Sequence, residues 1–203
     1  MHKLNIPNTW NYISLTKDLN YIATGVEKYK GEKFYFSTGS IKKQDHIAEG
    51  KYTFSSKPSR ANRIGAEGDV LQARMKGTNK CLLVKGTQTA SLFSTGFIQL
   101  RSYGNTIAPK YIFHYLNSKI FLDIKDELCS GSTQSALNDK AADKLFFPLA
   151  PQKEQLRIVE KLEELFSELD KGVEYLEKSY SQLIVYRQAL LKHAFEGKLT
   201  EQW

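Results

Sequence analysis

The sequence PLAPQKEQLRIVEKLEELFSELD, from Pro148 to Asp170, marks a change in the organisation of the chain. Two prolines, Pro148 and Pro151, precede a pattern of apolar residues at helical spacing that continues to Phe195. Proline is favoured in the first turn of a helix and disfavoured in its interior, so the pattern predicts a helix that begins just after Pro151. Gly197 follows the last apolar position and predicts the end of this helix.

The apolar residues of the predicted helix form a heptad repeat. Steps of three and four residues alternate as far as Ala194, and five heptads in phase predict a coiled-coil seam. Arg187 is the one polar residue in the seam; it either fixes the register by meeting Glu163 or Glu164 of a partner helix, or packs its aliphatic stem and keeps its charge in water. The residues that we expect at a dimer interface are Val159, Leu162, Phe166, Leu169, Val173, Leu176, Tyr180, Leu183, Arg187 and Leu190.

This helix is too long for the rest of the chain to cover. Residues 152–195 would span roughly 66 Å at 1.5 Å per residue, whereas a domain of ~150 residues is about 30–35 Å across. Each seam leucine left in water forgoes about 1.5–3 kcal/mol, so we expect a second copy of the helix to cover the seam. A hairpin that folds back at Gly172 is less favoured, because no Pro or Asn beside Gly172 supports a turn and the heptads continue through it.

Residues 1–150 have a different pattern. Short β-rich runs bounded by Gly, Asn and Ser predict strands, and helices are predicted from Leu15 and over 109–128. We therefore predict an α+β fold, in which a mixed α/β globular domain in residues 1–150 is followed by one long coiled-coil helix in residues 151–203. The predicted strands lie within residues 34–41, 51–56, 68–75, 80–86 and 91–100.

Charge divides the chain in the same way. Residues 151–203 hold 8 basic and 10 acidic side chains, a net charge of −2, which leaves 21 basic and 12 acidic side chains and a net charge of +9 for residues 1–150. This excess indicates a polyanionic partner for the first part, although a merely basic soluble domain would have the same composition. The two cysteines fit neither a zinc site nor a disulfide framework, and no run of apolar residues is long enough to cross a membrane. We expect a cytoplasmic protein without a membrane partner.

Motifs for catalysis are missing from the sequence. It has no phosphate-binding loop, no GxGxxG, no HExxH and no paired Cys/His spacing, and it lacks the [ND]PP[YF] tetrapeptide of adenine-N6 methyltransferases. The four histidines are scattered. We therefore expect a protein that is not an enzyme and that carries no cofactor and no metal.

Several stretches, in order, resemble the specificity (S) subunits of type I restriction-modification systems. The segment Pro148–Asp170, with Glu154 and Gln155, resembles the conserved connector that leads from a proline-rich strand end into a long heptad helix. IPNTWNYISL (6–15) resembles the opening of a target-recognition domain, GDVLQARMKGT (68–78) its central strand and turn, and GSTQSALN (131–138) a later motif. Ala150-Pro151 stands where the family usually has a double proline. The resemblance covers nearly the whole chain.

The resemblance implies a DNA target-recognition domain in residues 1–150 and a connector and dimerisation helix in residues 151–203. It implies partners too: double-stranded DNA, the adenine-N6 methyltransferase (modification) subunit, and through that complex the restriction subunit. Family members usually carry two such sets in one chain, so this one is either a natural half-subunit or a truncated one. A half-length chain would read one half of an interrupted target and restore the pair as a homodimer.

Basic and polar residues of the first domain are candidates for DNA contact. Arginine can bind guanine with two hydrogen bonds, and Gln134 could pair with an adenine edge in the major groove. Each basic residue could equally be solvated surface charge, and Gln134 could belong to a loop that caps a short helix near 135–144, with Ser135 as N-cap. The candidates are Lys57, Arg60, Arg63, Arg74, Lys76, Lys80, Thr133 and Gln134.

A second interpretation belongs to a different class of protein. A coiled-coil dimer with a basic domain could be an adaptor that binds other proteins and has no specific DNA target. Co-purification with a methyltransferase subunit, or a neighbouring methyltransferase gene, would distinguish the two.

Overall fold

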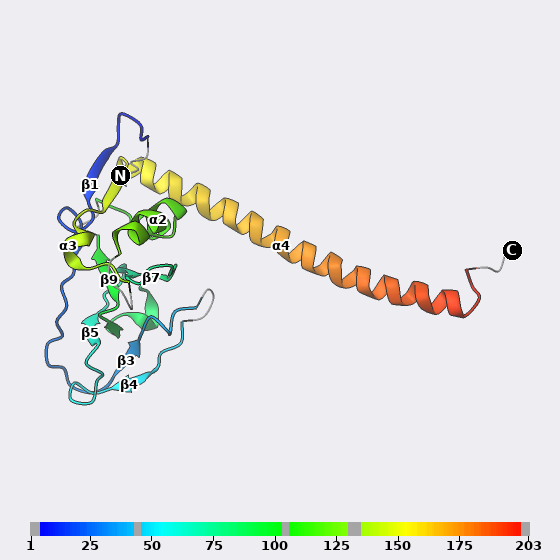
Figure 1. The fold of residues 1–203 in the computed structure, drawn as a ribbon, viewed down its shortest axis with the longest axis horizontal. Helices are drawn as coiled ribbons and strands as arrows, with labels where there is room; N and C mark the ends of the chain where they lie inside the picture. Colours follow the sequence, from blue (N-terminus) through cyan, green and yellow to red (C-terminus); the bar gives the residue numbers. More distant parts are fainter. Residues whose placement is uncertain (1–4, 43–45, 103–105, 130–134, 200–203) are drawn as a thin grey trace. The chain divides into compact units, whose positions relative to one another are not determined.

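A computed structural model describes residues 5–42, 46–102, 106–129 and 135–199 (Figure 1). The chain divides into two compact units, Met1–Val159 and Glu160–Trp203. The division falls nine residues after the boundary at 150/151 expected from the sequence. The reason is that the first two turns of helix α4 (Gln152–Phe195) pack within the first unit, where Gln155 and Val159 are buried.

The first unit contains two four-stranded sheets. The central sheet has the order β2-β9-β6-β7 and is antiparallel throughout. The second sheet has the order β4-β3-β8-β5, and within it β3 and β8 run parallel. The strands of the central sheet are β2 (Asn20–Tyr21), β6 (Val70–Ala73), β7 (Cys81–Leu83) and β9 (Phe97–Arg101); those of the second are β3 (Lys33–Phe36), β4 (Gly50–Tyr52), β5 (Ala61–Ile64) and β8 (Leu92–Ser94).

The central sheet is covered on both faces, which explains why its strands read as nearly continuous apolar runs. Along β6, side chains alternate between two clusters of buried residues. Val70 packs with helices α1 (Pro109–Leu116) and α2 (Lys119–Leu128), and Leu71 packs with the second sheet. Phe36 and Phe93 of the second sheet stack at 5.4 Å between ring centroids in the latter cluster. The mixed α/β composition expected from the sequence is confirmed.

The helices of the first unit differ from the prediction in two places. The helix expected over 109–128 is interrupted at Asn117-Ser118, where Ser118 caps a new helix by accepting a hydrogen bond from the Phe121 N–H at 3.3 Å. The two pieces are α1 (Pro109–Leu116) and α2 (Lys119–Leu128). The helix expected from Leu15 is wrong. Leu15 and Leu19 are both buried at helical spacing, but Asp18 accepts from the Ser14 N–H at 2.6 Å and holds this segment in a turn before β2.

A short sheet ties the beginning of the chain to the connector. Strand β1 (Asn11–Ser14) pairs antiparallel with β10 (Phe146–Leu149), which leads through Pro151 into α4. A third short helix, α3 (Asp139–Ala142), precedes β10, and a 3₁₀ turn, η1, covers Gly86–Gln88. The N-cap of α3 is Asn138 and not Ser135, because the Asn138 Oδ1 accepts from the Ala141 N–H at 2.8 Å.

Gln155 fixes the start of α4 to the first unit. Its Oε1 accepts from the Ala108 N–H at 3.0 Å, and its Nε2 donates to the Ala150 carbonyl at 2.8 Å. The side chain is 1% exposed and satisfies three backbone groups, since Nε2 also lies 3.3 Å from the Thr106 carbonyl. The Glu154-Gln155 motif therefore has a structural role in this chain: it ties the connector to the turn that begins α1.

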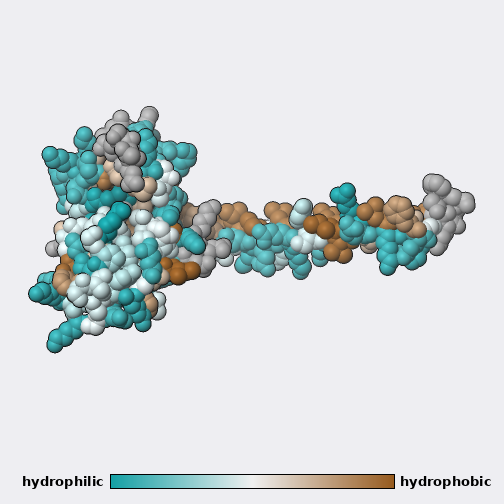
Figure 2. Space-filling model, turned by 60° about the horizontal axis from the view of Figure 1, so that its bottom comes forward, coloured by the Kyte–Doolittle hydropathy of each residue, from teal (hydrophilic) through white to brown (hydrophobic). Residues whose placement is uncertain are grey.

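The second unit is a continuous helix. Helix α4 runs through Gly172 without a break, so the hairpin alternative is excluded. Beyond Phe195, Gly197 adopts φ +75°, and the Lys198 N–H reaches back to the His193 carbonyl, which ends the helix as the sequence predicts. Apolar side chains run along this helix in Figure 2 and remain exposed in the single chain. In the described part of the chain, no helix is long and apolar enough to span a membrane.

Candidate nucleic-acid interface

The β6–β7 turn, residues 74–80, carries Arg74, Lys76 and Lys80 and is called the basic turn below. Helix α2 holds the turn from below: Lys125 Nζ donates to the Met75 carbonyl at 2.7 Å and to the Thr78 carbonyl at 2.9 Å. The Gly77 N–H, at φ +68°, donates to Asp126 Oδ2 at 2.9 Å. Because Lys125 is fully buried and bound to two carbonyls, it fixes the backbone that carries three of the predicted DNA residues.

The same turn holds the chain just after the predicted polar loop. The Lys76 N–H donates to the Ser135 carbonyl at 3.0 Å, and the Leu137 N–H donates to the Arg74 carbonyl at 2.9 Å. Thr133 and Gln134 lie outside the described residues. Ser135 is the next residue along the chain, so the polar loop re-enters the described fold at the basic turn.

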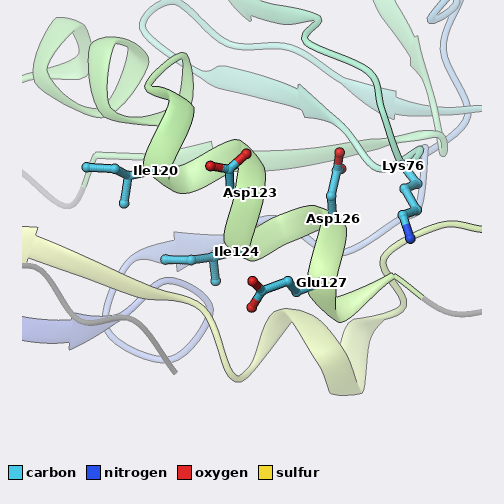
Figure 3. A pocket seen from close by; sticks show the side chains of 6 residues that line it. All are labelled: Lys76, Ile120, Asp123, Ile124, Asp126 and Glu127. Atoms are coloured by element: carbon cyan, nitrogen blue, oxygen red, sulfur yellow. The ribbon is translucent and has the colours of Figure 1, made fainter.

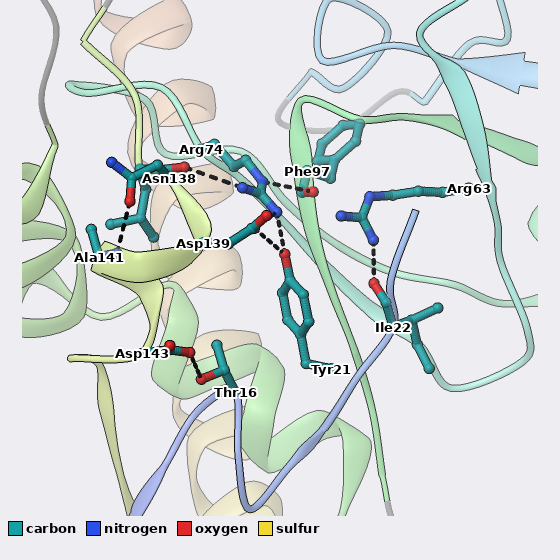
Figure 4. Close-up of polar contacts among 11 residues, drawn as sticks. Thr16, Tyr21, Ile22, Arg63, Arg74, Phe97, Asn138, Asp139, Ala141 and Asp143 are labelled. Atoms are coloured by element: carbon teal, nitrogen blue, oxygen red, sulfur yellow. Dashed lines mark hydrogen bonds and ion pairs between the residues drawn. The ribbon is translucent and has the colours of Figure 1, made fainter. Parts of the chain in front are cut away.

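Arg74 is engaged in a polar network and is mostly buried (Figure 4). Its guanidinium donates to the carbonyls of Phe97 and Leu137 at 3.2 and 3.3 Å, forms an ion pair with Asp139 at 2.7 Å, and bonds the hydroxyl of Tyr21. That hydroxyl in turn donates to Asp139 at 2.7 Å. This geometry does not support the prediction that Arg74 binds DNA directly, because the N–H groups of its guanidinium already donate to acceptors within the protein.

Hydrogen bonds in this network shift the pKa of the Asp139 carboxyl. The hydrogen bond from Tyr21, followed by that from Arg74, lowers the pKa of the Asp139 carboxyl below its ordinary value. Asp139 thus stays ionised and keeps the pair with Arg74. The arrangement joins β2, β6 and the start of α3, and so positions the backbone on either side of the basic turn.

Arg63 is a core residue, and its burial does not favour the predicted contact with DNA. Its side chain is 1% exposed, and Nη1 donates to the Ile22 carbonyl at 2.5 Å. Burial lowers the pKa of this guanidinium. The sequence places Arg63 in a basic cluster with Lys57 and Arg60, but it lies on β5 at a position that points inward.

The other basic candidates divide by what their side-chain nitrogens contact. Lys57 Nζ donates to the Ala61 carbonyl at 2.9 Å and Lys80 Nζ to the Thr38 carbonyl at 2.7 Å, and both side chains are half-buried. Arg60 and Lys76 are exposed. Arg60 and Arg74 both lie near Gly96 in the β8–β9 turn. The Arg74 N–H donates to the Gly96 carbonyl, and a Cβ added at Gly96 would lie 3.3 Å from Arg60 Nη2. The structure therefore brings Arg60 beside the basic turn.

A pocket of about 580 Å³ lies next to Lys76 on the surface of α2 (Figure 3). Asp123, Asp126 and Glu127 line it together with Ile120 and Ile124. Three carboxylates beside one lysine make this surface unfavourable for a phosphate, so Lys76 is a weaker candidate for DNA than Arg60. Among the residues that the structure describes, no group of three or more His, Cys, Asp or Glu side chains could hold a metal ion.

Nine of the ten predicted dimer residues lie on α4 beyond the first unit. Of these, Phe166, Leu169, Val173, Leu176, Tyr180, Leu183 and Leu190 are large apolar side chains exposed by 38–71%. Val159 differs, because it is buried in the core of the first unit. Leu162 is half-buried, so the exposed seam begins at Phe166 and not at Val159.

The part of the chain that holds the β6–β7 turn and the first half of α4 matches a known family. Residues 42–176, about two thirds of the chain, match the type I restriction modification DNA specificity domain. The chain belongs to this family. The match includes both the basic turn and the first half of the exposed helix. The family is described as a DNA specificity domain. This description supports the prediction that the chain is not an enzyme.

Two curated specificity subunits are similar to this specificity-domain chain. It is 26% identical over 164 residues to the type I restriction enzyme StySPI specificity subunit of Salmonella potsdam, which covers 79% of this chain and 34% of that protein. It is 31% identical over 93 residues to the EcoKI specificity subunit of Escherichia coli K12, covering 46% of this chain and 20% of that protein. The chain thus spans about a third or less of these relatives.

Solved structures have the same fold. The HsdS subunit of Thermoanaerobacter tengcongensis superposes with a TM-score of 0.76 at 21% identity, covering 91% of this chain and 49% of that one. A chain from a solved structure of the type I R-M system gives a TM-score of 0.71 at 21% identity, covering 98% of this chain and 50% of that one. The predicted α+β domain followed by a long helix is therefore an arrangement found in about half of each solved chain.

Proposed function

We propose that this chain is a DNA sequence-recognition part of a type I restriction-modification complex. It reads one half of an interrupted double-stranded target and does not itself catalyse. The observation that carries the proposal is the family match, which extends over the basic domain and into the exposed helix. The net charge of +9 in residues 1–150 supports a polyanionic partner for the same part.

In this proposal the surface around the β6–β7 turn faces DNA. Arg60 is the exposed guanidinium beside the turn, and Ser135 continues from Thr133 and Gln134, which we propose as polar readers. Lys57 and Lys80 keep one contact each with a backbone carbonyl and have further donors available for phosphate. Arg74 supports the surface from within and does not read bases.

The helix has a separate role in the proposal. Its exposed seam pairs with the same helix of a second copy, antiparallel, and holds two recognition domains apart. A two-fold pair presents identical surfaces in opposite orientation, so the two half-sites would be inverted copies. We also propose that the pair docks the adenine-N6 methyltransferase subunit, and through it the restriction subunit, in the cytoplasm. The similarity to specificity subunits supports these partners.

Selection of bound fragments from random double-stranded DNA tests the function. The proposal expects an inverted repeat with a fixed gap, each half a few base pairs long. Each base pair contributes about 1–3 kcal/mol of discrimination, so one half-site alone selects poorly against a genome. Recovery of DNA without any shared sequence, from a chain that is folded and dimeric, would instead support the adaptor interpretation.

A further inference from the structure

The last turns of α4 carry a second apolar stripe beside the seam. Positions seven residues apart on one flank of the seam change character along the helix: the first lies at the start of α4 and is apolar, the next three are acidic, and the last two are apolar. Phe195, four residues after Leu191, extends the apolar end and is 92% exposed. The flank positions are Leu156, Glu163, Asp170, Glu177, Ile184 and Leu191.

The beginning of α4 shows the complementary feature. Its seam side is already used within the first unit, where Gln155 and Val159 are buried. Leu156, on the flank, is half exposed and lies at the edge of a surface pocket of about 600 Å³. The pocket is apolar on the side of Ile107, Ala108 and Pro109 and polar on the side of Glu67, Arg101, Ser102 and Gln152. A partner helix that arrives at this end can therefore reach an apolar surface only on the flank.

Heptad arithmetic connects the two ends. If Val173 of one copy lies opposite Leu176 of the other at the two-fold axis, Phe166 faces Leu183 and Leu162 faces Arg187. In this antiparallel register, flank residues meet when their numbers add to about 347, so Leu191 meets Leu156 of the second copy. Phe195 then lies near the second copy's Gln152. The same rule places Ile184 opposite Glu163 and Asp170 opposite Glu177. A register shifted by one heptad toward the C-terminus would set both apolar residues against acidic ones, Leu191 against Glu163 and Ile184 against Asp170, and would leave Leu156 uncovered.

We infer that Leu191 and Phe195 of one copy pack on Leu156 and the adjoining pocket of the other copy. This inference rests on the homodimer of the proposed function and adds its register and a contact between the helix end and the partner's recognition domain. The contact fixes how far apart the two domains lie along DNA.

Cross-linking of mixed dimers tests the register. Chains carrying Leu156→Cys and Leu191→Cys, each in a Cys129→Ser background, are co-expressed and treated with a short bismaleimide; Cys81 is buried. Only the mixed pair should cross-link, because equivalent positions in one antiparallel dimer lie roughly 50 Å apart along the helices. A dimer in which Glu163→Cys cross-links with Leu191→Cys instead, or in which no pair does, overturns the inference. A monomer by light scattering would contradict the proposed homodimer itself.

A pair of truncations supplies a second measurement. Phe195→Ala should weaken dimerisation by about 100-fold or more, because each two-fold dimer loses two buried aromatic side chains. Tyr175→Ala is the matched control, since Tyr175 is 71% exposed on the face of α4 away from the seam, and its dissociation constant should not change. Equal effects of the two substitutions would contradict the contact.

Discussion

The two units of the chain differ in whether their large apolar side chains are buried or exposed. In Met1–Val159 the large apolar side chains are mostly buried in clusters on both faces of the central sheet, and several basic residues are buried with them. In Glu160–Trp203 the described apolar side chains are exposed along a helix. The first unit has a core of its own, whereas the described part of the second unit has none in the single chain. The difference shows that an apolar pattern in a sequence predicts that the side chains become buried. It does not show whether the same chain or another chain covers them.

Charge shows a related contrast. The first part of the chain is basic and the second is slightly acidic, yet much of the basic character is used internally: Arg63 and Lys125 are buried, and Arg74 is mostly buried. The net charge of a domain is therefore a better guide to the sign of its partner than to the residues that touch it.

The largest effect should come from charging the exposed seam. Leu169→Glu with Leu176→Glu would bury four unpaired carboxylates in each dimer, and we expect complete dissociation at micromolar concentration. Sedimentation velocity measures the change, and circular dichroism checks that the first unit stays folded. Ser167→Glu with Ser181→Glu adds the same charge on the outer face of the helix and should leave the dimer intact. If the seam variant remains dimeric, the seam does not form the interface.

Changing the length of α4 should change the gap between the two half-sites without changing the bases that each recognition domain selects. One extra heptad between Leu169 and Leu176 preserves the seam phase and adds roughly 10 Å, or about 3 bp of gap at 3.4 Å per base pair. It also rotates the half-sites by about a third of a turn, so binding is either retuned to a longer gap or lost. Selection from random DNA reads out both. Half-sites of altered base sequence with an unchanged gap would contradict the proposal that α4 sets the gap and the first unit selects the bases.

Within the first unit, Arg74→Ala should act on stability. It leaves the Phe97 and Leu137 carbonyls without this donor and removes the pair with Asp139, so we expect a loss of about 2–3 kcal/mol in the free energy of unfolding. Urea titration measures it. Lys76→Ala, two residues along and exposed, should change stability by less than about 0.5 kcal/mol. An Arg74→Ala protein of normal stability that no longer binds DNA would restore Arg74 as a direct contact.

The smallest effects should be those of exposed charge on the salt dependence of DNA binding. If Arg60 touches one phosphate, Arg60→Ala reduces the slope of log K against log salt by about 0.9. Lys76→Ala should reduce it less, because Asp123, Asp126 and Glu127 line the same pocket as Lys76 and make that surface unfavourable for a phosphate. Titrations at several salt concentrations give both slopes. Equal slopes for Arg60→Ala and the unchanged chain would remove Arg60 from the interface.

Much of the architecture was predictable because its signals are local. The heptads, Pro151 and Gly197 define α4, and the β-rich runs locate five strands of the two larger sheets and part of a sixth. The failures arise where local and tertiary signals conflict. Leu15 and Leu19 have helical spacing, yet the turn held by Asp18 decides the conformation. Asn117-Ser118 divides one apolar pattern between two helices that pack on the same core.

The candidate site was less predictable, because it depends on which side chains meet in three dimensions. Arg63 looks like its neighbour Arg60 in sequence, and only the position of β5 buries one and exposes the other. Gln155 was noticed as part of a motif, but its bonds to Ala108 and Ala150 follow from the closing of β1 on β10. Val159 belongs to the heptad pattern but is buried in the core of the first unit.

The most direct test of the account is the mass of the unmodified chain in solution, measured by multi-angle light scattering across micromolar concentrations. An exposed seam of seven large apolar side chains predicts a species of twice the 23.2 kDa chain mass. The dimer should persist in high salt, because apolar burial and not charge holds it together. A single species of 23.2 kDa over the whole range would contradict the account.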